Sequence, residues 1–507
     1  MSKFKLLSVC FLIICLCSPS ASGSAGNVIQ NGSPDWEVEG DQEGALFGMT
    51  VSDAGDVNCD GYDDVIVGAK FYDNAPYTDS GKIFVFYGSE DGLSSTPDWT
   101  AVAPVQEFNG YFGAVVASAG DINGDGCADI MASMPNHNNG GSDAGAVYVW
   151  HGSSSGLGTS PNWYAEHTTT YAHLGWSMGS AGDVNGDGYD DIIVGAYRYD
   201  AVGASDAYVW YGSATGLGAN GTPTNADWTV HESATKNGFG SRVGTAGDVN
   251  GDGFDDVYVG APDFDNVQVD EGKVFVWYGS STGLPESPIP ESADWAAESN
   301  QTGARFSCHW SSGPDNGCVG TAGDINGDGY DDFMIGSYEY DHPDGEGNEG
   351  AVFMWYGSAT GLNEGVHGYP ANAGWVVETT QESARLGTGV SKAGDFNGDG
   401  RDDVMMSAYL YDYNEVPNSG LVVMWYGREE GLHNTASVED YDWMNAPPYG
   451  GSAFGWVLSN AGDVNGDGAD DIIVGAPYHD GDLTDVGTAV VWYGNSLAYL
   501  YLPMIVK

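Results

Sequence analysis

Eleven residues near the middle of the chain, Ala181-Gly182-Asp183-Val184-Asn185-Gly186-Asp187-Gly188-Tyr189-Asp190-Asp191, carry the pattern that decides the fold. The opening Ala-Gly-Asp, followed by an apolar residue and Asn, recurs with its Asp at 56, 121, 183, 248, 324, 395 and 463. Successive copies lie 62 to 76 residues apart. A regular period of this length indicates a repeat architecture, so we expect one large repeat domain rather than several unrelated ones.

Each copy has the same internal order. An aromatic residue or Leu precedes Gly, as in Phe239-Gly240, with Phe306-Ser307 as the exception; the Asp-rich stretch and an apolar run follow. An aromatic pair with Gly, such as Trp277-Tyr278-Gly279, and then a further Trp complete the unit. Four short β-type segments separated by Gly, Asp, Asn and Pro predict a small antiparallel sheet per unit.

Seven such sheets predict an all-β fold, a seven-bladed β-propeller of four-stranded antiparallel blades over residues 26–496, because radial closure leaves few open edges. The phase of the repeat supports closure. The first unit begins at a Trp36 segment and the last stops after a Trp492 segment, so the first strand is expected to complete the last sheet. A linear solenoid would need distinct capping units instead.

The charge balance excludes several functions. The 507 residues include 72 Asp or Glu and 14 Lys or Arg, a net charge of −58. Such a polyanion is repelled by phosphate backbones and anionic lipid surfaces, so we expect no nucleic-acid partner. Divalent cations are the natural partners. The hydrophobic fraction of 41% is sufficient for a folded core.

The two terminal segments are read separately from the repeats. Residues 1–25 combine two lysines, an apolar run from Leu6 to Leu16 and small residues, which predicts a secretory signal peptide. We therefore expect a secreted, extracellular or cell-surface protein without a transmembrane anchor. Residues 497–507 form a short apolar tail, read either as a surface-sorting or docking tail or as a strand packed on the last blade.

Four cysteines lie outside the signal segment. Cys308 and Cys318 close a short loop and are predicted to form a disulfide bond, which suits an oxidising compartment. Cys59 and Cys127 could pair if their loops lie side by side, or they could be two buried thiols.

The Asp-rich loops are candidate metal sites. Numbering each loop from its first Asp, side-chain oxygens recur at positions 1, 3, 5 and 9, and a backbone carbonyl at position 7 can add a ligand. The expected ligands are Asp56, Asn58, Asp60, Tyr62 and Asp64; Asp121, Asn123, Asp125, Cys127 and Asp129; Asp183, Asn185, Asp187, Tyr189 and Asp191; Asp248, Asn250, Asp252, Phe254 and Asp256; Asp324, Asn326, Asp328, Tyr330 and Asp332; Asp395, Asn397, Asp399, Arg401 and Asp403; and Asp463, Asn465, Asp467, Ala469 and Asp471.

Three carboxylates within nine residues favour Ca²⁺, and the chain offers up to seven such sites. His and Cys side chains are absent from the side-chain ligand positions, which argues against zinc. Position 12 is apolar in every copy, as at Val194, so the loop lacks the Glu of an EF-hand and runs into a buried strand. The alternative is that Asp and Asn only cap turns, but seven such copies would repel strongly without a cation.

The Phe-Gly, Asp-rich and Gly-Ala-Pro strings, the last at Gly260-Ala261-Pro262 and Gly475-Ala476-Pro477, resemble FG-GAP repeats, which build the amino-terminal propeller of integrin α chains. The resemblance covers about residues 31–494. It implies calcium loops on one face of the propeller and a partner on the opposite face. Integrin α chains have calcium loops in only some blades and continue into leg domains and a membrane span, so we expect a secreted or surface FG-GAP protein rather than an integrin subunit.

The resemblance places the connections that follow each Gly-Ala run on the partner-binding face. Most of them carry an aromatic residue beside Asp, as in Phe71-Tyr72-Asp73. These aromatics could contact sugars or proteins, or could pack between blades. The irregular loops Ser307–Cys318, His342–Glu349 and Asn363–Tyr369 are further candidates for binding.

No catalytic constellation stands out, so we expect a non-enzyme. The predicted function is adhesion or extracellular recognition of a protein or glycan. The alternatives are a lectin-type propeller and, with less support, a calcium-dependent polysaccharide lyase.

Overall fold

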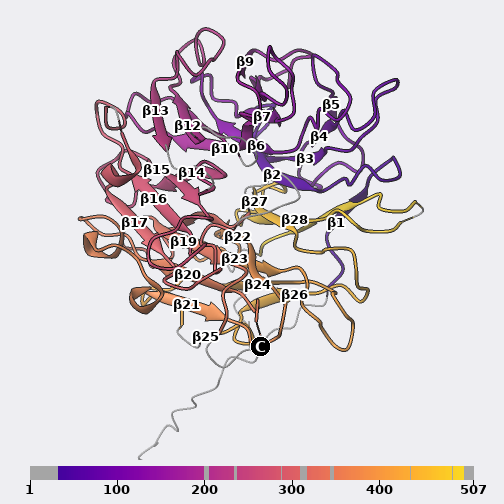
Figure 1. Cartoon of the computed structure of the whole chain (residues 1–507). Coiled ribbons are helices and arrows are strands. Elements are labelled where there is room, and N and C mark those ends of the chain that lie inside the picture. Colours follow the sequence, from indigo (N-terminus) through magenta and orange to yellow (C-terminus); the bar gives the residue numbers. More distant parts are fainter. Residues whose placement is uncertain are drawn as a thin grey trace, which may run out of the picture.

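A computed structural model describes residues 32–198, 205–232, 237–286, 288–308, 317–342, 347–433, 436–481 and 483–495. Within this part, 29 strands form seven antiparallel sheets arranged as blades around a common centre (Figure 1). The prediction of a seven-bladed propeller is confirmed. The signal segment 1–25 and the tail 497–507 lie outside the described residues.

Each blade runs outward from an innermost strand. Blade 1 contains β2 (Thr50–Gly55), β3 (Asp64–Ala69), β4 (Lys82–Phe86) and β5 (Trp99–Ala101). Blade 2 contains β6 (Val116–Gly120), β7 (Asp129–Met134), β8 (Ala146–Trp150) and β9 (Trp163–Glu166). Blade 3 contains β10 (Leu174–Gly182), β11 (Asp191–Ala196), β12 (Ser205–Trp210) and β13 (Trp228–Glu232). Blade 4 contains β14 (Arg242–Gly247), β15 (Asp256–Ala261), β16 (Lys273–Trp277) and β17 (Trp295–Glu298).

The remaining blades follow the same order. Blade 5 contains β18 (Val319–Gly323), β19 (Asp332–Ser337), β20 (Ala351–Trp355) and β21 (Trp375–Glu378), with β25 (Ala436–Ser437) added in parallel to β21. Blade 6 contains β22 (Leu386–Gly394), β23 (Asp403–Ala408), β24 (Leu421–Trp425) and β26 (Trp443–Asn445). Blade 7 contains β27 (Val457–Gly462), β28 (Asp471–Ala476), β29 (Thr488–Trp492) and β1 (Trp36–Glu39). Three short 3₁₀ turns, η1 (Pro290–Ser292), η2 (Leu362–Gly365) and η3 (Pro370–Asn372), lie in connections.

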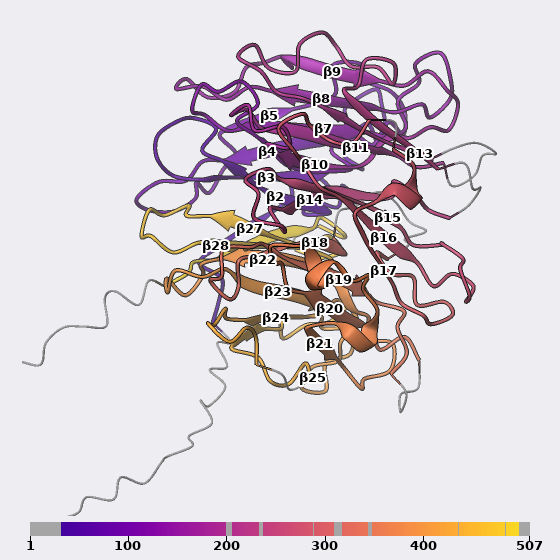
Figure 2. The ribbon, with the colours of Figure 1, turned by 90° about the vertical axis from the view of Figure 1, so that its left-hand side faces the viewer.

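The ring closes as the repeat phase predicts. Strand β1, from the amino-terminal end of the described chain, pairs antiparallel with β29, with Trp36 opposite Val491 and Val38 opposite Ala489. Blade 7 therefore combines the two ends of the propeller in one sheet. The second view places the outermost strands β9 and β25 at opposite edges of the molecule (Figure 2).

The core lies between the blades. The second strand of each blade is buried along its whole length, as in β11 (Asp191–Ala196), because neighbouring sheets cover both of its faces. This explains why these strands read as continuous apolar runs rather than as alternating patterns. No helix in the described part of the chain is long and apolar enough to cross a membrane.

Candidate metal centres and ligand surface

The Asp-rich loops all join the innermost strand of a blade to its second strand. In blade 3 the loop leaves β10 after Gly182 and enters β11 at Asp191, and these two residues are paired in the sheet. The loop is thus a β-hairpin turn, as predicted. Position 5 is exposed, position 1 is half-buried and position 9 is buried, so the oxygens extend from solvent into the blade.

The first Asp organises the turn. In blade 3, Asp183 Oδ1 accepts the backbone N–H groups of Gly186 at 2.7 Å and Asp187 at 3.1 Å, while Oδ2 accepts that of Gly188 at 2.8 Å. The bond from position 6 to the first Asp recurs in all seven loops. The turn-capping role is therefore present. It leaves further lone pairs on these carboxylates for a cation.

The ninth position is a buried carboxylate held by two backbone donors. Asp191 Oδ2 accepts the N–H of Val184 at 3.1 Å, and Oδ1 accepts that of Gly212 at 2.8 Å. Burial raises the pKa of Asp191 to about 8 and that of Asp256 to about 9. A buried carboxylate in this environment favours neutralisation by a proton or a cation.

Some oxygens at ligand positions have no hydrogen-bond partner. Asn58 Oδ1 and Asn397 Oδ1 are buried without one in the described structure. In blade 6 the Asn397 amide Nδ2 donates to Asp403 at 3.1 Å, which leaves Oδ1 available. Hard oxygen donors without partners beside fixed carboxylates suit Ca²⁺.

The glycine at position 6 allows the loop to turn sharply. Gly188 has φ +88°, and no atom lies within 4 Å of the place a side chain would take. As the loops stand, no group of three His, Cys, Asp or Glu side chains in the described residues is placed to hold a metal ion. The donor chemistry fits calcium, but the carboxylates would have to draw together around it.

Both disulfide questions have an answer in the structure. Cys308 and Cys318 are bonded, as predicted. Cys59 and Cys127 also pair, with their Cα atoms 5.2 Å apart, so the two Asp-rich loops of blades 1 and 2 are joined covalently. The sequence left this pairing open because it depends on which loops are neighbours in space.

The aromatics beside Asp on the opposite face pack mainly against their own protein. Phe71 contacts Tyr111, and Tyr340 contacts Phe353, in both cases with ring centroids 5.2 Å apart. Phe264 likewise packs on Phe275. This favours the packing role over a ligand role for these three residues. Parts of the irregular loops, residues 309–316 and 343–346, lie outside the described residues.

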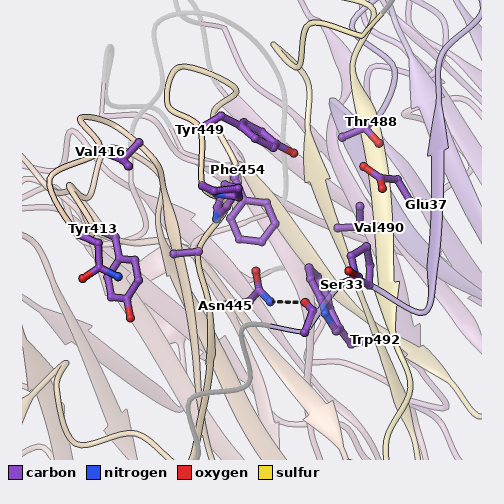
Figure 3. A pocket seen from close by; sticks show the side chains of 16 residues that line it. Ser33, Glu37, Tyr413, Val416, Asn445, Tyr449, Phe454, Thr488, Val490 and Trp492 are labelled. Atoms are coloured by element: carbon purple, nitrogen blue, oxygen red, sulfur yellow. Dashed lines mark hydrogen bonds between the residues drawn. The ribbon is translucent and has the colours of Figure 1, made fainter.

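A pocket between blades 6 and 7 is of a size that suits a small ligand, and sequence reasoning missed it. Its volume is about 510 Å³. Aromatic side chains line it together with a few polar groups (Figure 3); they include Tyr413, Tyr449, Phe454, Trp492, Glu37, Asn445 and Thr488. The run Pro447-Pro448-Tyr449 beside the closing strands was the signal that could have indicated it.

The pocket lies where the ring closes. In blade 3 the chain between the third and fourth strands crosses the outer strand of blade 2, where Trp163 Nε1 donates to Ala219 O at 2.9 Å and Ala165 pairs with Gly221. The fourth strand of blade 7 comes from the other end of the chain, so at this place the residues just before β1 approach β26. Asn445 there donates to Gly32 O at 3.3 Å.

Comparison with protein families identifies the repeat. Six segments match the FG-GAP repeat, at residues 50–86, 112–150, 174–211, 239–277, 319–353 and 454–492. They fall in six of the seven blades, and blade 6, which the match omits, has the same strand order and loop.

Individual relatives share about a third of their aligned residues with this chain. A phosphatidylinositol-glycan-specific phospholipase D of Bos taurus is 37% identical over 151 residues, covering 28% of this chain and 17% of the relative. Integrin alpha-5 of Xenopus laevis is 31% identical over 175 residues, covering 32% of this chain and 16% of the relative. The aligned parts thus span less than a fifth of either relative.

One solved structure, the exotype rhamnogalacturonan lyase YesX, aligns with 90% of this chain and 75% of its own chain. The TM-score is 0.38 and the identity 12%. A likeness at this level supports no argument about activity.

Proposed function

Because the chain is a propeller built of FG-GAP repeats, we propose that it is a calcium-stabilised recognition module that acts outside the cell or on its surface. The observation that carries the calcium part is the Asp-rich loop, present seven times with the same backbone bonds and the same buried carboxylate. Bound Ca²⁺ would neutralise the clustered carboxylates and tie the loop to the blade. The side chain at position 9 is held by the blade. The side chains at positions 1, 3 and 5, which lie in the turn, would move towards the ion.

Calorimetry with and without EDTA tests this part. At a calcium concentration of 100 Kd each site adds about 2.7 kcal/mol, so seven sites add roughly 19 kcal/mol. We expect EDTA to lower the melting temperature by more than about 10 °C, and added Ca²⁺ to restore it. Mg²⁺ at equal concentration serves as the control. An unchanged melting temperature in EDTA contradicts the calcium proposal.

Recognition outside the cell is supported by several features together. Two disulfide bonds suit an oxidising compartment. The similarity to integrin α chains points to adhesion as the class of function. The net charge of −58 favours a cationic or cation-bridged partner. We propose an extracellular protein or glycan as the ligand, with binding rather than catalysis as the activity.

The pocket between blades 6 and 7 favours the glycan alternative at one specific place. Tyr449 is 41% exposed, and Glu37 and Asn445 lie in the same lining. Aromatic faces beside hydrogen-bonding groups are suited to a sugar ring.

Arrays of extracellular proteins and of glycans, probed with and without Ca²⁺, test the recognition proposal. If the pocket holds a glycan, Tyr449→Ala and Glu37→Gln should weaken glycan binding at least about tenfold, the effect of losing about 1.4 kcal/mol. Tyr164→Ala, another exposed tyrosine, should leave it unchanged. Protein binding that survives the pocket variants would favour adhesion. Release of unsaturated oligosaccharides would instead show a lyase, and saturable binding to neither array would contradict the recognition proposal.

A further inference from the structure

The eighth position of the loop is occupied by Asp in six blades, and its contacts lead to the neighbouring blade. In blade 3, Asp190 Oδ2 accepts the backbone N–H of Asp121, the first loop residue of blade 2, at 2.7 Å. The same bond links Asp255 to Asp183, Asp331 to Asp248, Asp402 to Asp324, Asp470 to Asp395 and Asp63 to Asp463, at 2.7 to 3.0 Å. The last of these joins blade 1 to blade 7.

This contact explains the glycine of the Ala-Gly-Asp string. Gly120 precedes the first loop Asp and has φ +73°. A Cβ there would collide with the Asp190 carboxylate, and one at Gly182 would collide with Asp255. The glycine leaves room for the carboxylate of the next blade to reach the backbone N–H.

The junction between blades 1 and 2 departs from the pattern. Position 8 of the second loop is Ala128, which still donates its N–H to Asp56 O at 3.0 Å but has no carboxylate to accept the N–H of Asp56. The Cys59–Cys127 disulfide joins the loops at this junction. At the other junctions position 4 is Gly. In five of them a Cβ at this Gly would meet the position 7 residue of the next loop, as one at Gly124 would meet Tyr189.

We propose that the eighth-position aspartates are latches that join the Asp-rich loops into one continuous ring, and that the Cys59–Cys127 disulfide replaces the latch missing between blades 1 and 2. Each latch holds the backbone N–H of the first loop residue. The carboxylate of that residue caps its own turn and is a proposed calcium ligand. The first loop residue thus takes part both in the bond to the next blade and in its own turn. Ordering of one loop therefore favours ordering of its neighbour. The calcium part of this inference rests on the proposed function, whereas the latch itself does not.

Thermal melting in EDTA tests the latch without any metal. A hydrogen bond to a charged group contributes about 1.5–3 kcal/mol. We expect each lost latch to lower the melting temperature by about 1–3 °C in a domain of this size. The triple variant Asp190→Ala/Asp255→Ala/Asp331→Ala should show the sum of three such shifts. The triple variant Asp91→Ala/Glu286→Ala/Glu430→Ala removes the same charge from exposed sites and is the matched control.

Two outcomes decide this arm. Asp→Asn at the same three positions keeps an acceptor oxygen and should retain most of the stability. If the Ala triple variant and its charge-matched control have the same melting temperature, the latch proposal is contradicted.

The disulfide junction gives an independent arm. Cys59→Gly/Cys127→Tyr converts the junction to the residues found elsewhere and removes the covalent link. Adding Ala128→Asp supplies the missing latch. We expect the double variant to melt below the wild type and the triple variant to regain at least about 1 °C over the double variant. If adding Ala128→Asp does not raise the melting temperature, the proposal that the disulfide takes the place of the missing latch is overturned.

Calorimetric titration with Ca²⁺ tests the coupling of the loops. We expect the Ala latch triple to bind Ca²⁺ several-fold more weakly than its charge-matched control. Equal affinities would show that the latch does not pass order between the calcium loops. If the wild type binds no Ca²⁺, the calcium proposal fails. The thermal-melting experiments in EDTA still decide whether the latch exists.

Discussion

At the scale of single residues, His167 shows how burial sets a charge state. The imidazole Nδ1 accepts the backbone N–H of Thr169 at 2.9 Å, which requires that nitrogen to be unprotonated. Burial and then the nearby Arg198 lower the pKa of His167 to about 4, although Asp206 opposes the shift. The folded protein therefore holds His167 neutral at pH values where an unfolded His takes up a proton.

This predicts a defined loss of stability in mild acid. The contribution of His167 is fully present above its unfolded pKa of about 6.5 and is lost as the pH falls from there towards 4. Between pH 7.5 and pH 5 the loss should be roughly 1–2 kcal/mol in the free energy of unfolding, after allowance for partial solvent access. Urea unfolding of the wild type and of His167→Gln at both pH values measures it. Because other groups titrate in both proteins, the test is the difference between the two, and equal pH dependence would contradict the prediction.

At the scale of elements, the Trp that opens each outer strand connects neighbouring blades. Trp295 in β17 of blade 4 packs edge-on against Trp355 of blade 5, with ring centroids 5.4 Å apart. The indole Nε1 of Trp295 also donates to Val366 O in the connection of blade 5 at 2.8 Å. The outer strand is therefore stabilised by the next blade as well as by its own sheet.

The burial of this Trp should determine how much it contributes to the free energy of unfolding. Trp295 is fully buried, and its replacement by Ala should cost about 3–5 kcal/mol through lost burial and a cavity. Trp99 in β5 makes the same kinds of contact, with Trp150 and Gly158, but it is only partly buried. Trp99→Ala should therefore cost clearly less. Chemical denaturation of the two variants compares them, and equal losses would argue against burial as the cause.

At the scale of the whole molecule, the repeat pattern was sufficient for the fold. The recurrence of Ala-Gly-Asp gave the number of blades, and the terminal Trp36 and Trp492 segments gave the closure. Both follow from local patterns that the chain repeats in order. The β-hairpin position of the Asp-rich loops was likewise predictable, because an apolar strand follows each loop directly.

Features that depend on contacts between blades could not be predicted in the same way. The Cys59–Cys127 bond requires the side-by-side arrangement of two loops 68 residues apart in sequence. The role of Asp190 is hidden because its partner, the N–H of Asp121, belongs to another repeat. The pocket at Tyr449 lies between blade 6 and blade 7, where β1 closes the ring, and a repeat pattern does not describe a place that occurs once.

The pairing of β1 with β29 also sets an order of events during synthesis. Trp36 leaves the ribosome early, but its partner Val491 follows more than 450 residues later. Blades 1 to 6 can form as they emerge, because the strands of each are close in sequence, whereas blade 7 must wait for the last. Until then β1 has no sheet to join, and the completed blades form an open arc. The last hairpin of the propeller thus converts an arc with two exposed ends into a closed disc.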